Sequence, residues 1–243
     1  MDFYKFEEPL TEGTIIGRPN RFLMDVKINK EVVRCHCPST GRIGDIVFKD
    51  IACLLSRSKN KERKTPYTVE AISLDPLSKK DKDYIGINQV KMNDYVDFFL
   101  KKGRFSKVVG KEKILRERKL GNSRIDFLVG KTYLEVKMPL IILPSKNSNK
   151  KEKQSKFNSF DRLIKHFEDL SKSLRNNYKA VILLSYVYDA KPFSPPKKDA
   201  TNSRIIKAAK DAHKKGVETW QANFKIDKKG VYFRKLLKLN LFS

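Results

Sequence analysis

The chain has 243 residues, 40% of them hydrophobic, and its 53 Lys and Arg residues against 28 Asp and Glu residues give a formal net charge of +25. The apolar content excludes an intrinsically disordered chain, and the longest apolar stretch, residues 180–188, is too short to span a membrane. A charge this large indicates a polyanionic partner, with DNA as the first candidate and RNA not excluded. The alternatives are an anionic membrane surface and a source whose proteins are basic in general.

Residues 1–85 are predicted to form a small OB-like β-barrel domain, and their 16 Lys and Arg residues nearly balance 13 Asp and Glu residues. Short β-rich pieces separated by turn residues occupy 13–17, 22–28, 31–37, 45–55 and 67–74. Five short strands at this spacing are typical of a sandwich or barrel, and an OB-like barrel would offer a platform for nucleic acid.

The three cysteines, Cys35, Cys37 and Cys53, form an odd set that disfavours a disulfide framework and favours a reducing, cytoplasmic location. Cys35-His36-Cys37 alternates within a predicted strand, and no second pair at zinc-finger spacing accompanies it. We therefore interpret these cysteines as strand residues rather than zinc ligands. The N-terminus has no basic segment followed by an apolar run, which predicts no signal peptide.

Residues 86–243 are predicted to form an α/β domain around a mixed sheet, and they carry 37 Lys and Arg residues against 15 Asp and Glu residues. Helices are predicted at 92–101, at 158–174 and from Asn202 or Ser203 to Lys215, and strands at 111–119, 180–188, 217–224 and 231–239. The lysine-rich segment 145–156 is predicted to be a mobile loop that either grips phosphates or has no role.

Within this domain, two strands at 123–129 and 132–137 flank a tight turn at Gly130-Lys131. Glycine at the first central position suits a type II′ hairpin turn. Outward pairing from that turn places Asp126 opposite Glu135 and predicts that Lys137 shares their face.

The other face of the hairpin is predicted to carry the apolar side chains Ile125, Phe127, Leu134 and Val136. Directly opposed carboxylates repel each other, so they require a shared proton, a basic side chain or a bound cation. A solvated, charged face is the ordinary interpretation of such a hairpin. The alignment of both acids with a nearby lysine favours a divalent-metal site for phosphodiester cleavage.

The hairpin resembles the core of the PD-(D/E)xK nuclease superfamily, in which Asp and then Glu-x-Lys bind metal and assist water. More specific motifs follow one another along the chain: Arg18-Pro19-Asn20-Arg21-Phe22, His36-Cys37-Pro38-Ser39-Thr40-Gly41-Arg42, Ser123-Arg124-Ile125-Asp126-Phe127, Leu134-Glu135-Val136-Lys137, the helical set Arg162, Lys165, His166 and Leu170, and Gly216-Val217-Glu218. Together they resemble the sugar fermentation stimulation protein (SfsA-like) family, with Ser39 where Asn is usual and Leu163 where Gly is usual.

The resemblance implies an N-terminal OB-like barrel, a C-terminal nuclease-like domain and DNA binding. Asp126 and Glu135 would hold Mg²⁺ or Mn²⁺, and Lys137 would orient the attacking water or stabilise the transition state. Glu117 is either a third metal and catalytic carboxylate or an ordinary strand charge paired with Arg116 or Arg118.

Eight further residues are candidates for contact with nucleic acid: Arg18, Asn20, Arg21, Arg42, Arg124, Arg162, Lys165 and His166. Arg124 could instead neutralise the acids, and His166 could act as acid, base or donor. The sequence thus predicts a DNA-binding protein with a metal-dependent nuclease site; the alternative is a non-catalytic DNA-binding or regulatory protein that retains a nuclease fold. Self-association is left open.

Overall fold

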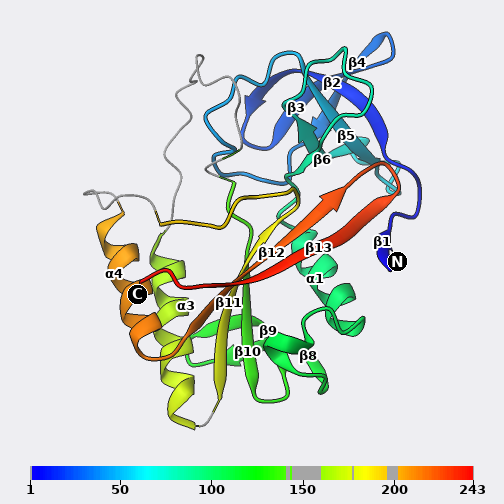
Figure 1. Ribbon diagram of the computed structural model, residues 1–243. Coiled ribbons are helices and arrows are strands. Elements are labelled where there is room, and N and C mark those ends of the chain that lie inside the picture. The colour runs from blue at the N-terminus through cyan, green and yellow to red at the C-terminus, as the bar shows by residue number, and fades with distance from the viewer. Residues whose placement is uncertain (1, 141–142, 144–159, 177, 196–201, 243) are drawn as a thin grey trace.

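The computed structural model describes residues 2–140, 143, 160–176, 178–195 and 202–242, and it places a β-barrel at one end of a larger mixed sheet with helices (Figure 1). The predicted α+β class, with an OB-like barrel ahead of an α/β unit, is confirmed. The predicted loop at 145–156 lies outside the described residues. None of the described helices is long and apolar enough to cross a membrane.

The barrel sheet has the order β4-β3-β2-β5-β6-β7 and is formed by β2 (Thr11–Asn20), β3 (Leu23–Ile28), β4 (Glu31–His36), β5 (Ile51–Arg57), β6 (Tyr67–Ser73) and β7 (Ile85–Gly86). Pairing of His36 with Thr68 joins β4 to β6 and closes the sheet. Met24 and Val26, two residues apart on β3, are fully buried, as alternation along a strand requires. The strand predicted at 45–55 begins only at Ile51, because turns occupy part of the segment before it.

The larger sheet has the order β1-β13-β12-β11-β10-β9-β8 and is formed by β1 (Phe3–Lys5), β8 (Ile114–Leu120), β9 (Ser123–Val129), β10 (Thr132–Lys137), β11 (Lys179–Tyr186), β12 (Glu218–Ile226) and β13 (Gly230–Leu239). The central strands β10, β11 and β12 are parallel, and the other pairs are antiparallel. Parallel neighbours need crossover connections, which the helices supply.

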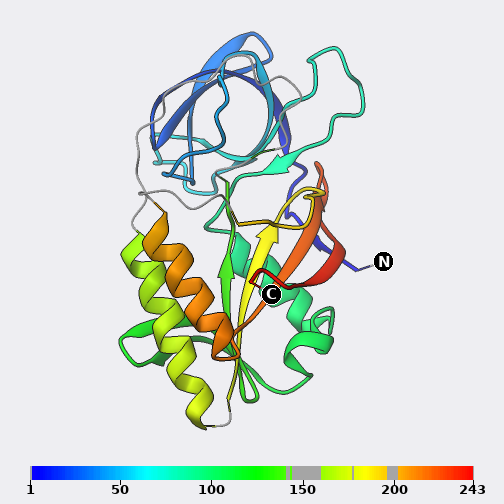
Figure 2. The ribbon, with the colours of Figure 1, turned by 60° about the vertical axis from the view of Figure 1, so that its left-hand side comes forward.

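The two crossovers contain α3 (Phe160–Ser173), followed by the short 3₁₀ helix η1 (Leu174–Asn176), and α4 (Ser203–Lys214), whereas α1 (Met92–Lys101) and α2 (Ser106–Val109) lie between the barrel and β8 in the chain. Figure 2 shows α3 and α4 side by side on one face of the sheet and α1 on the opposite face. One apolar cluster accordingly joins α3 and α4 to the sheet, and another joins α1, the opposite face and the barrel.

Two contacts tie the barrel to the end of the sheet. The Gly86 N–H donates to the Val187 carbonyl over 2.9 Å, and the Gly44 N–H donates to the Leu140 carbonyl over 2.6 Å. A Cβ atom on Gly86 would lie 2.5 Å from the Cβ of Val187, so only glycine allows this approach. β1 also crosses over: it precedes the barrel in the chain but pairs with β13 of the larger sheet.

Candidate functional site

The β9–β10 hairpin has the register that the turn predicted. Gly130 has a φ of 55°, and Val129, Leu128 and Phe127 pair with Thr132, Tyr133 and Leu134. Lys131, the second turn residue, is not among the residues with positive φ, which agrees with a type II′ turn. The paired register ends at Phe127 and Leu134, one residue before the predicted Asp126–Glu135 pair, and side-chain hydrogen bonds hold the two strands together there.

Beyond Phe127 the carboxylates interrupt the regular pattern of the hairpin. The Val136 N–H donates to Asp126 Oδ2 over 2.8 Å, and the Asp126 N–H donates to Glu135 Oε2 over 3.4 Å. The prediction that Ile125 and Phe127 share a face is wrong, since Ile125 packs in the α3–α4 cluster and Phe127 in the cluster containing α1. The strict alternation of β9 is lost at Asp126, whose side chain bonds to the neighbouring backbone.

Glu135 is 1% exposed and contacts two basic side chains through Oε1. Lys137 Nζ donates to this oxygen, and His166 Nδ1, on α3, lies 2.5 Å from it. Burial raises the pKa of Glu135, but the His166 hydrogen bond and the Lys137 ammonium outweigh burial and leave the pKa below its usual value. Glu135 is thus a buried carboxylate held between Lys137 and His166. The side chain of Lys137 is 28% exposed.

Asp126 has the opposite electrostatic character. Burial and the neighbouring charge of Glu135 raise the pKa of Asp126 to about 6, although the Val136 N–H and the Asn93 amide partly offset this effect. Asn93, in the first turn of α1, donates to Asp126 Oδ1 over 2.7 Å. Asn93 was not among the predicted site residues; the one available signal was a polar residue beside the apolar positions of a predicted helix.

A buried hydrogen bond fixes the position of α3 against β9. Ser123 Oγ donates to Asp169 Oδ2 over 2.7 Å, and Asp169 is 4% exposed. Gly121, in the turn before Ser123, leaves room for this carboxylate, because a Cβ there would lie 2.8 Å from Asp169 Oδ1. The first residue of the Ser-Arg-Ile-Asp-Phe motif therefore anchors the helix that carries His166.

Glu117 and Arg124 lie outside this cluster. Their side chains are 49% and 72% exposed and form an ion pair of 3.6 Å. Glu117 has a φ of 53°, an uncommon backbone conformation for a residue other than glycine. Within the described part of the chain, no three His, Cys, Asp or Glu side chains are grouped closely enough to hold one metal ion. The role of Glu117 as a third ligand stays a prediction, and Arg124 pairs with Glu117 rather than with Asp126.

The barrel candidates Arg18, Asn20 and Arg42 make bonds within the protein. Arg18 Nη2 donates to the Ser39 carbonyl over 2.8 Å, and Asn20 Oδ1 accepts from the Phe22 N–H over 2.8 Å. Arg42 forms an ion pair with Asp45.

The fourth barrel candidate, Arg21, is exposed, and its guanidinium lies 4.6 Å from the ring centroid of Phe22. The other candidates lie on α3, where Arg162 and Lys165 are exposed while His166 is 3% exposed and faces Glu135. The structure therefore brings Asp126, Glu135, Lys137 and His166 together and leaves the remaining candidates elsewhere.

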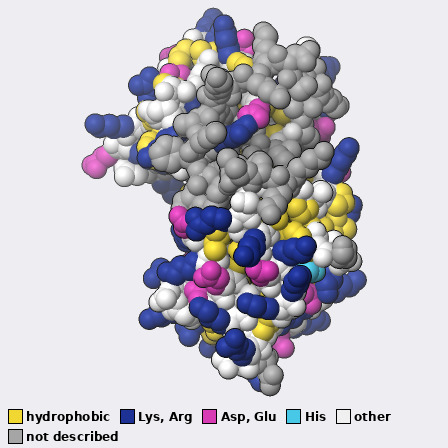
Figure 3. All heavy atoms as spheres, turned by 90° about the vertical axis from the view of Figure 1, so that its left-hand side faces the viewer, with side chains coloured by type: hydrophobic (Ala, Val, Ile, Leu, Met, Phe, Trp, Pro, Cys, Tyr) yellow, Lys and Arg dark blue, Asp and Glu magenta, His cyan; other side chains and the backbone are white. Residues whose placement is uncertain are grey.

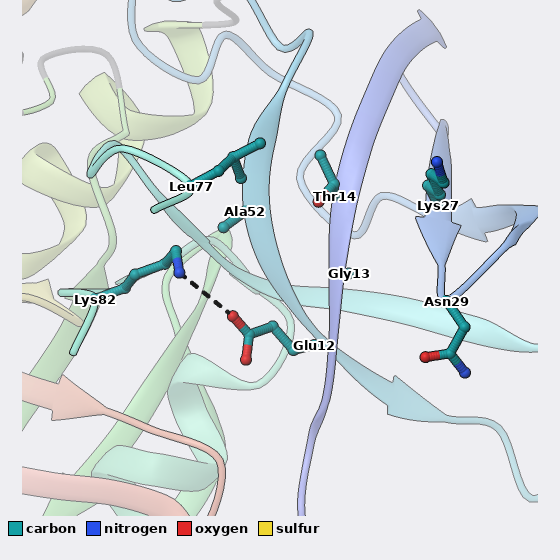
Figure 4. Close-up of a pocket in the computed structure, with 8 residues that line it drawn as sticks. All are labelled: Glu12, Gly13, Thr14, Lys27, Asn29, Ala52, Leu77 and Lys82. Atoms are coloured by element: carbon teal, nitrogen blue, oxygen red, sulfur yellow. Dashed lines mark ion pairs between the residues drawn. The ribbon is translucent and has the colours of Figure 1, made fainter. Parts of the chain in front are cut away.

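A separate pocket of about 350 Å³ lies on the barrel (Figure 4). Its lining includes Glu12 and Lys82, whose charged atoms are 3.7 Å apart, but none of the predicted site residues. The Asp126–Glu135 cluster is therefore distinct from this pocket.

Comparison with known proteins identifies both halves of the chain. A family model described as the SfsA N-terminal OB domain matches residues 16–87, and one described as the sugar fermentation stimulation protein RE domain matches residues 91–230. The chain belongs to the SfsA family. The predicted resemblance is thereby confirmed, and the restriction-endonuclease-like domain contains the whole Asp126–Glu135 cluster.

Relatives of the SfsA family match nearly the full chain. A sugar fermentation stimulation protein homolog of Synechococcus sp. (strain JA-2-3B'a(2-13)) is 30% identical over 94% of this chain and 92% of its own length. A homolog of Clostridium novyi (strain NT) is 34% identical over 84% of this chain and 85% of its own length. The solved structure of Pyrococcus furiosus SfsA in complex with Ca²⁺ covers 98% of both chains, with a TM-score of 0.76 and 20% identity, and so shares the fold.

Proposed function

We propose that this SfsA-family protein is a divalent-metal-dependent nuclease that hydrolyses phosphodiester bonds in DNA. The observation that carries the proposal is the approach of Asp126 and Glu135 from adjacent strands, with Lys137 bonded to Glu135. The RE domain match and the net charge of +25 support the same reaction and substrate class.

The donor chemistry of the cluster fits a hard divalent cation. Asp126 and Glu135 supply carboxylate oxygens, the ligands that Mg²⁺ prefers, and water would complete its coordination. Burial and the charge of Glu135 raise the pKa of Asp126 to about 6, and a cation would relieve the second of these effects. The Ca²⁺ complex of the Pyrococcus relative supports divalent-metal binding in this fold. When bound, such an ion lowers the pKa of water and stabilises charge on the phosphate.

The protein side chains have separate roles in this proposal. Asp126 and Glu135 hold the cation, and the buried His166 keeps Glu135 in place through the 2.5 Å contact with Oε1. Lys137 is partly exposed, so its ammonium can bind a phosphate oxygen or orient the attacking water. Asn93 fixes the second carboxylate by holding Asp126 Oδ1.

A non-catalytic DNA-binding protein is the second candidate. Both oxygens of Asp126 already accept hydrogen bonds, and Glu135 Oε1 contacts both Lys137 and His166. A cluster satisfied in this way could be structural and leave the protein to bind DNA without cleavage.

Incubation of the purified protein with plasmid and single-stranded DNA, in Mg²⁺ and separately in Mn²⁺, tests the proposal. We expect cleavage that Asp126→Asn abolishes and that the surface variant Asp81→Asn retains. DNA binding by the wild type and by Asp126→Asn, with no cleavage in either metal, would establish the second candidate instead. An RNA substrate in parallel reports on the choice of nucleic acid.

A further inference from the structure

The helices α3 and α4 carry a basic surface on their exposed sides, and α3 contacts the Asp126–Glu135 cluster through the buried His166. We define this α3–α4 basic surface by six exposed side chains: Arg162, Lys165, Arg204, Lys207, Lys210 and Lys214. Figure 3 shows Lys and Arg side chains spread over the described part of this face, with acidic side chains among them. We propose that this surface binds the phosphate backbone of duplex DNA and presents it to the candidate nuclease site.

The arrangement of the cations on α4 supports contact with an extended polyanion. Arg204, Lys207, Lys210 and Lys214 follow one another at spacings of three or four residues, so they form one stripe along the helix. At a rise of about 1.5 Å per residue, the stripe is about 15 Å long, a little under half a helical turn of duplex DNA. It can therefore follow one strand of the backbone without bending the duplex.

Most of these cations have no acidic partner within the described part of the protein. Arg204 pairs with Asp161 over 3.3 Å, whereas no ion pair with a described carboxylate joins the other five members of the surface. The sequence of α4 has four Lys and Arg residues and one acidic residue, Asp211, which lies four residues after Lys207. Lys210 and Lys214 are also four residues apart, a spacing at which like charges destabilise a helix. The excess of positive charge on α4 is explained if a polyanion neutralises it.

The connection to the candidate nuclease site is made by α3. His166, on the buried side of this helix, contacts Glu135, while Arg162, four residues earlier, is exposed. The Asp161–Arg204 ion pair joins the first turn of α3 to the first turn of α4. A backbone bound along α4 would thus meet α3 next to the helical turn that reaches Glu135.

The chemistry of the surface favours duplex DNA over the alternatives. Proteins that bind single strands stack bases on aromatic side chains, and the exposed, described positions of α3 and α4 carry no Phe, Tyr or Trp. Helices that lie on membranes bury bulky apolar side chains opposite a basic face. Here α3 and α4 direct Leu170 and Ala212 into the protein core instead.

The inference rests on the proposed function, and a paired set of variants separates the two. The test variant is Lys207→Gln, Lys210→Gln and Lys214→Gln combined. The control variant removes the same charge from β12 and β13 with Lys225→Gln, Arg234→Gln and Lys235→Gln, all at exposed positions. Binding of a fluorescent 20-base-pair duplex, of its single strand and of vesicles containing phosphatidylserine is measured by titration at several salt concentrations, after circular dichroism confirms that both variants are folded.

We expect the test variant to bind duplex at least tenfold more weakly than the control variant and to lower the slope of log K against log salt by about two to three, since each phosphate contact contributes about 0.9. Equal losses in both variants would overturn the inference and leave the nuclease proposal standing. A selective loss of vesicle or single-strand binding, with duplex binding unchanged, would also overturn it. Failure of the wild type to bind any nucleic acid would overturn both proposals.

Discussion

The side-chain amide of Asn93, on α1, donates a 2.7 Å hydrogen bond to Asp126 Oδ1, on β9. This bond joins the helix that follows the barrel to one of the two carboxylates of the candidate site. The other carboxylate, Glu135, is held from the opposite face of the sheet by His166 on α3. Each acid is therefore positioned by a different layer of the domain.

The first prediction concerns Asn93→Ala. Because residues that hold metal ligands typically contribute ten- to a hundredfold to metal affinity, we expect Ca²⁺ or Mg²⁺ binding, measured by isothermal titration calorimetry, to weaken by about tenfold or more. Asn176→Ala, at an exposed position in η1, serves as the control and should bind like the wild type. Unchanged metal affinity in Asn93→Ala would show that Asp126 is held without this bond.

The second prediction is that Asp126→Asn stabilises the protein at neutral pH. The pKa of Asp126 is raised from 3.8 to about 6, so the folded state binds a proton more tightly than the unfolded state does. Its contribution to stability is then fully present below about pH 4 and is lost as the pH rises through about 6. As the pH rises from about 4 to above 6, the free energy of unfolding of the variant should increase by up to about 3 kcal/mol relative to that of the wild type. Denaturant unfolding of both proteins from pH 4 to pH 7.5 measures the difference, and a constant difference would contradict the raised pKa.

Glu135→Gln is expected to destabilise the protein at neutral pH, in contrast to Asp126→Asn. The pKa of Glu135 is lowered by His166 and Lys137 in spite of burial, so its charged form stabilises the folded state at pH 7. Removal of the charge leaves Lys137 and the buried His166 without their carboxylate and should cost on the order of 3 kcal/mol. The same unfolding experiment at pH 7 checks this value, and a variant as stable as the wild type would show that the pair contributes nothing.

Ser123→Ala should destabilise the protein by about 1–3 kcal/mol, because the buried Asp169 carboxylate would lose the 2.7 Å bond from Ser123 Oγ. Ser171→Ala provides a matched control, since that hydroxyl bonds to the Phe167 carbonyl within the same helix. Thermal denaturation of the two variants compares them directly. Equal melting temperatures would mean that the link between β9 and α3 adds no stability.

Gly86→Ala should destabilise the junction between the barrel and the larger sheet. The added methyl group would lie 2.5 Å from the Cβ of Val187 and would force the two segments apart, at a cost of about 1–3 kcal/mol. Gly17→Ala is the control, because no atom of a described residue lies within 4 Å of a Cβ there. Limited proteolysis and thermal denaturation detect the separation. Equal proteolysis rates and equal melting temperatures of the two variants would show that the junction accommodates the methyl group without loss of stability.

Local patterns predicted the strand register of the site. The turn at Gly130-Lys131 determines which residues of β9 and β10 face each other, and its geometry depends on two adjacent residues. The helix at 92–101 was predicted with its observed bounds, because its apolar periodicity is strong. Such features depend on residues that are close together in the sequence, so a single sequence is enough to predict them.

Features that depend on tertiary contacts were beyond such patterns. Asn93 and Asp126 are 33 residues apart, and only packing of α1 under the sheet brings them together. β1 is three residues long and has a partner near the other end of the chain, so no periodicity could reveal it. Ile125 was placed on the wrong face because the side chain of Asp126, rather than its backbone, bonds to Val136.

The outermost strand β8 has a further consequence for how copies of the protein meet one another in solution. Its consecutive residues Arg116, Glu117, Arg118 and Lys119 are exposed along the outer margin of the seven-stranded sheet. Charged side chains on such a margin discourage the addition of a strand from another molecule. β8 thus protects this fold against intermolecular sheet growth, a hazard that its long hydrogen-bonded strands would otherwise invite.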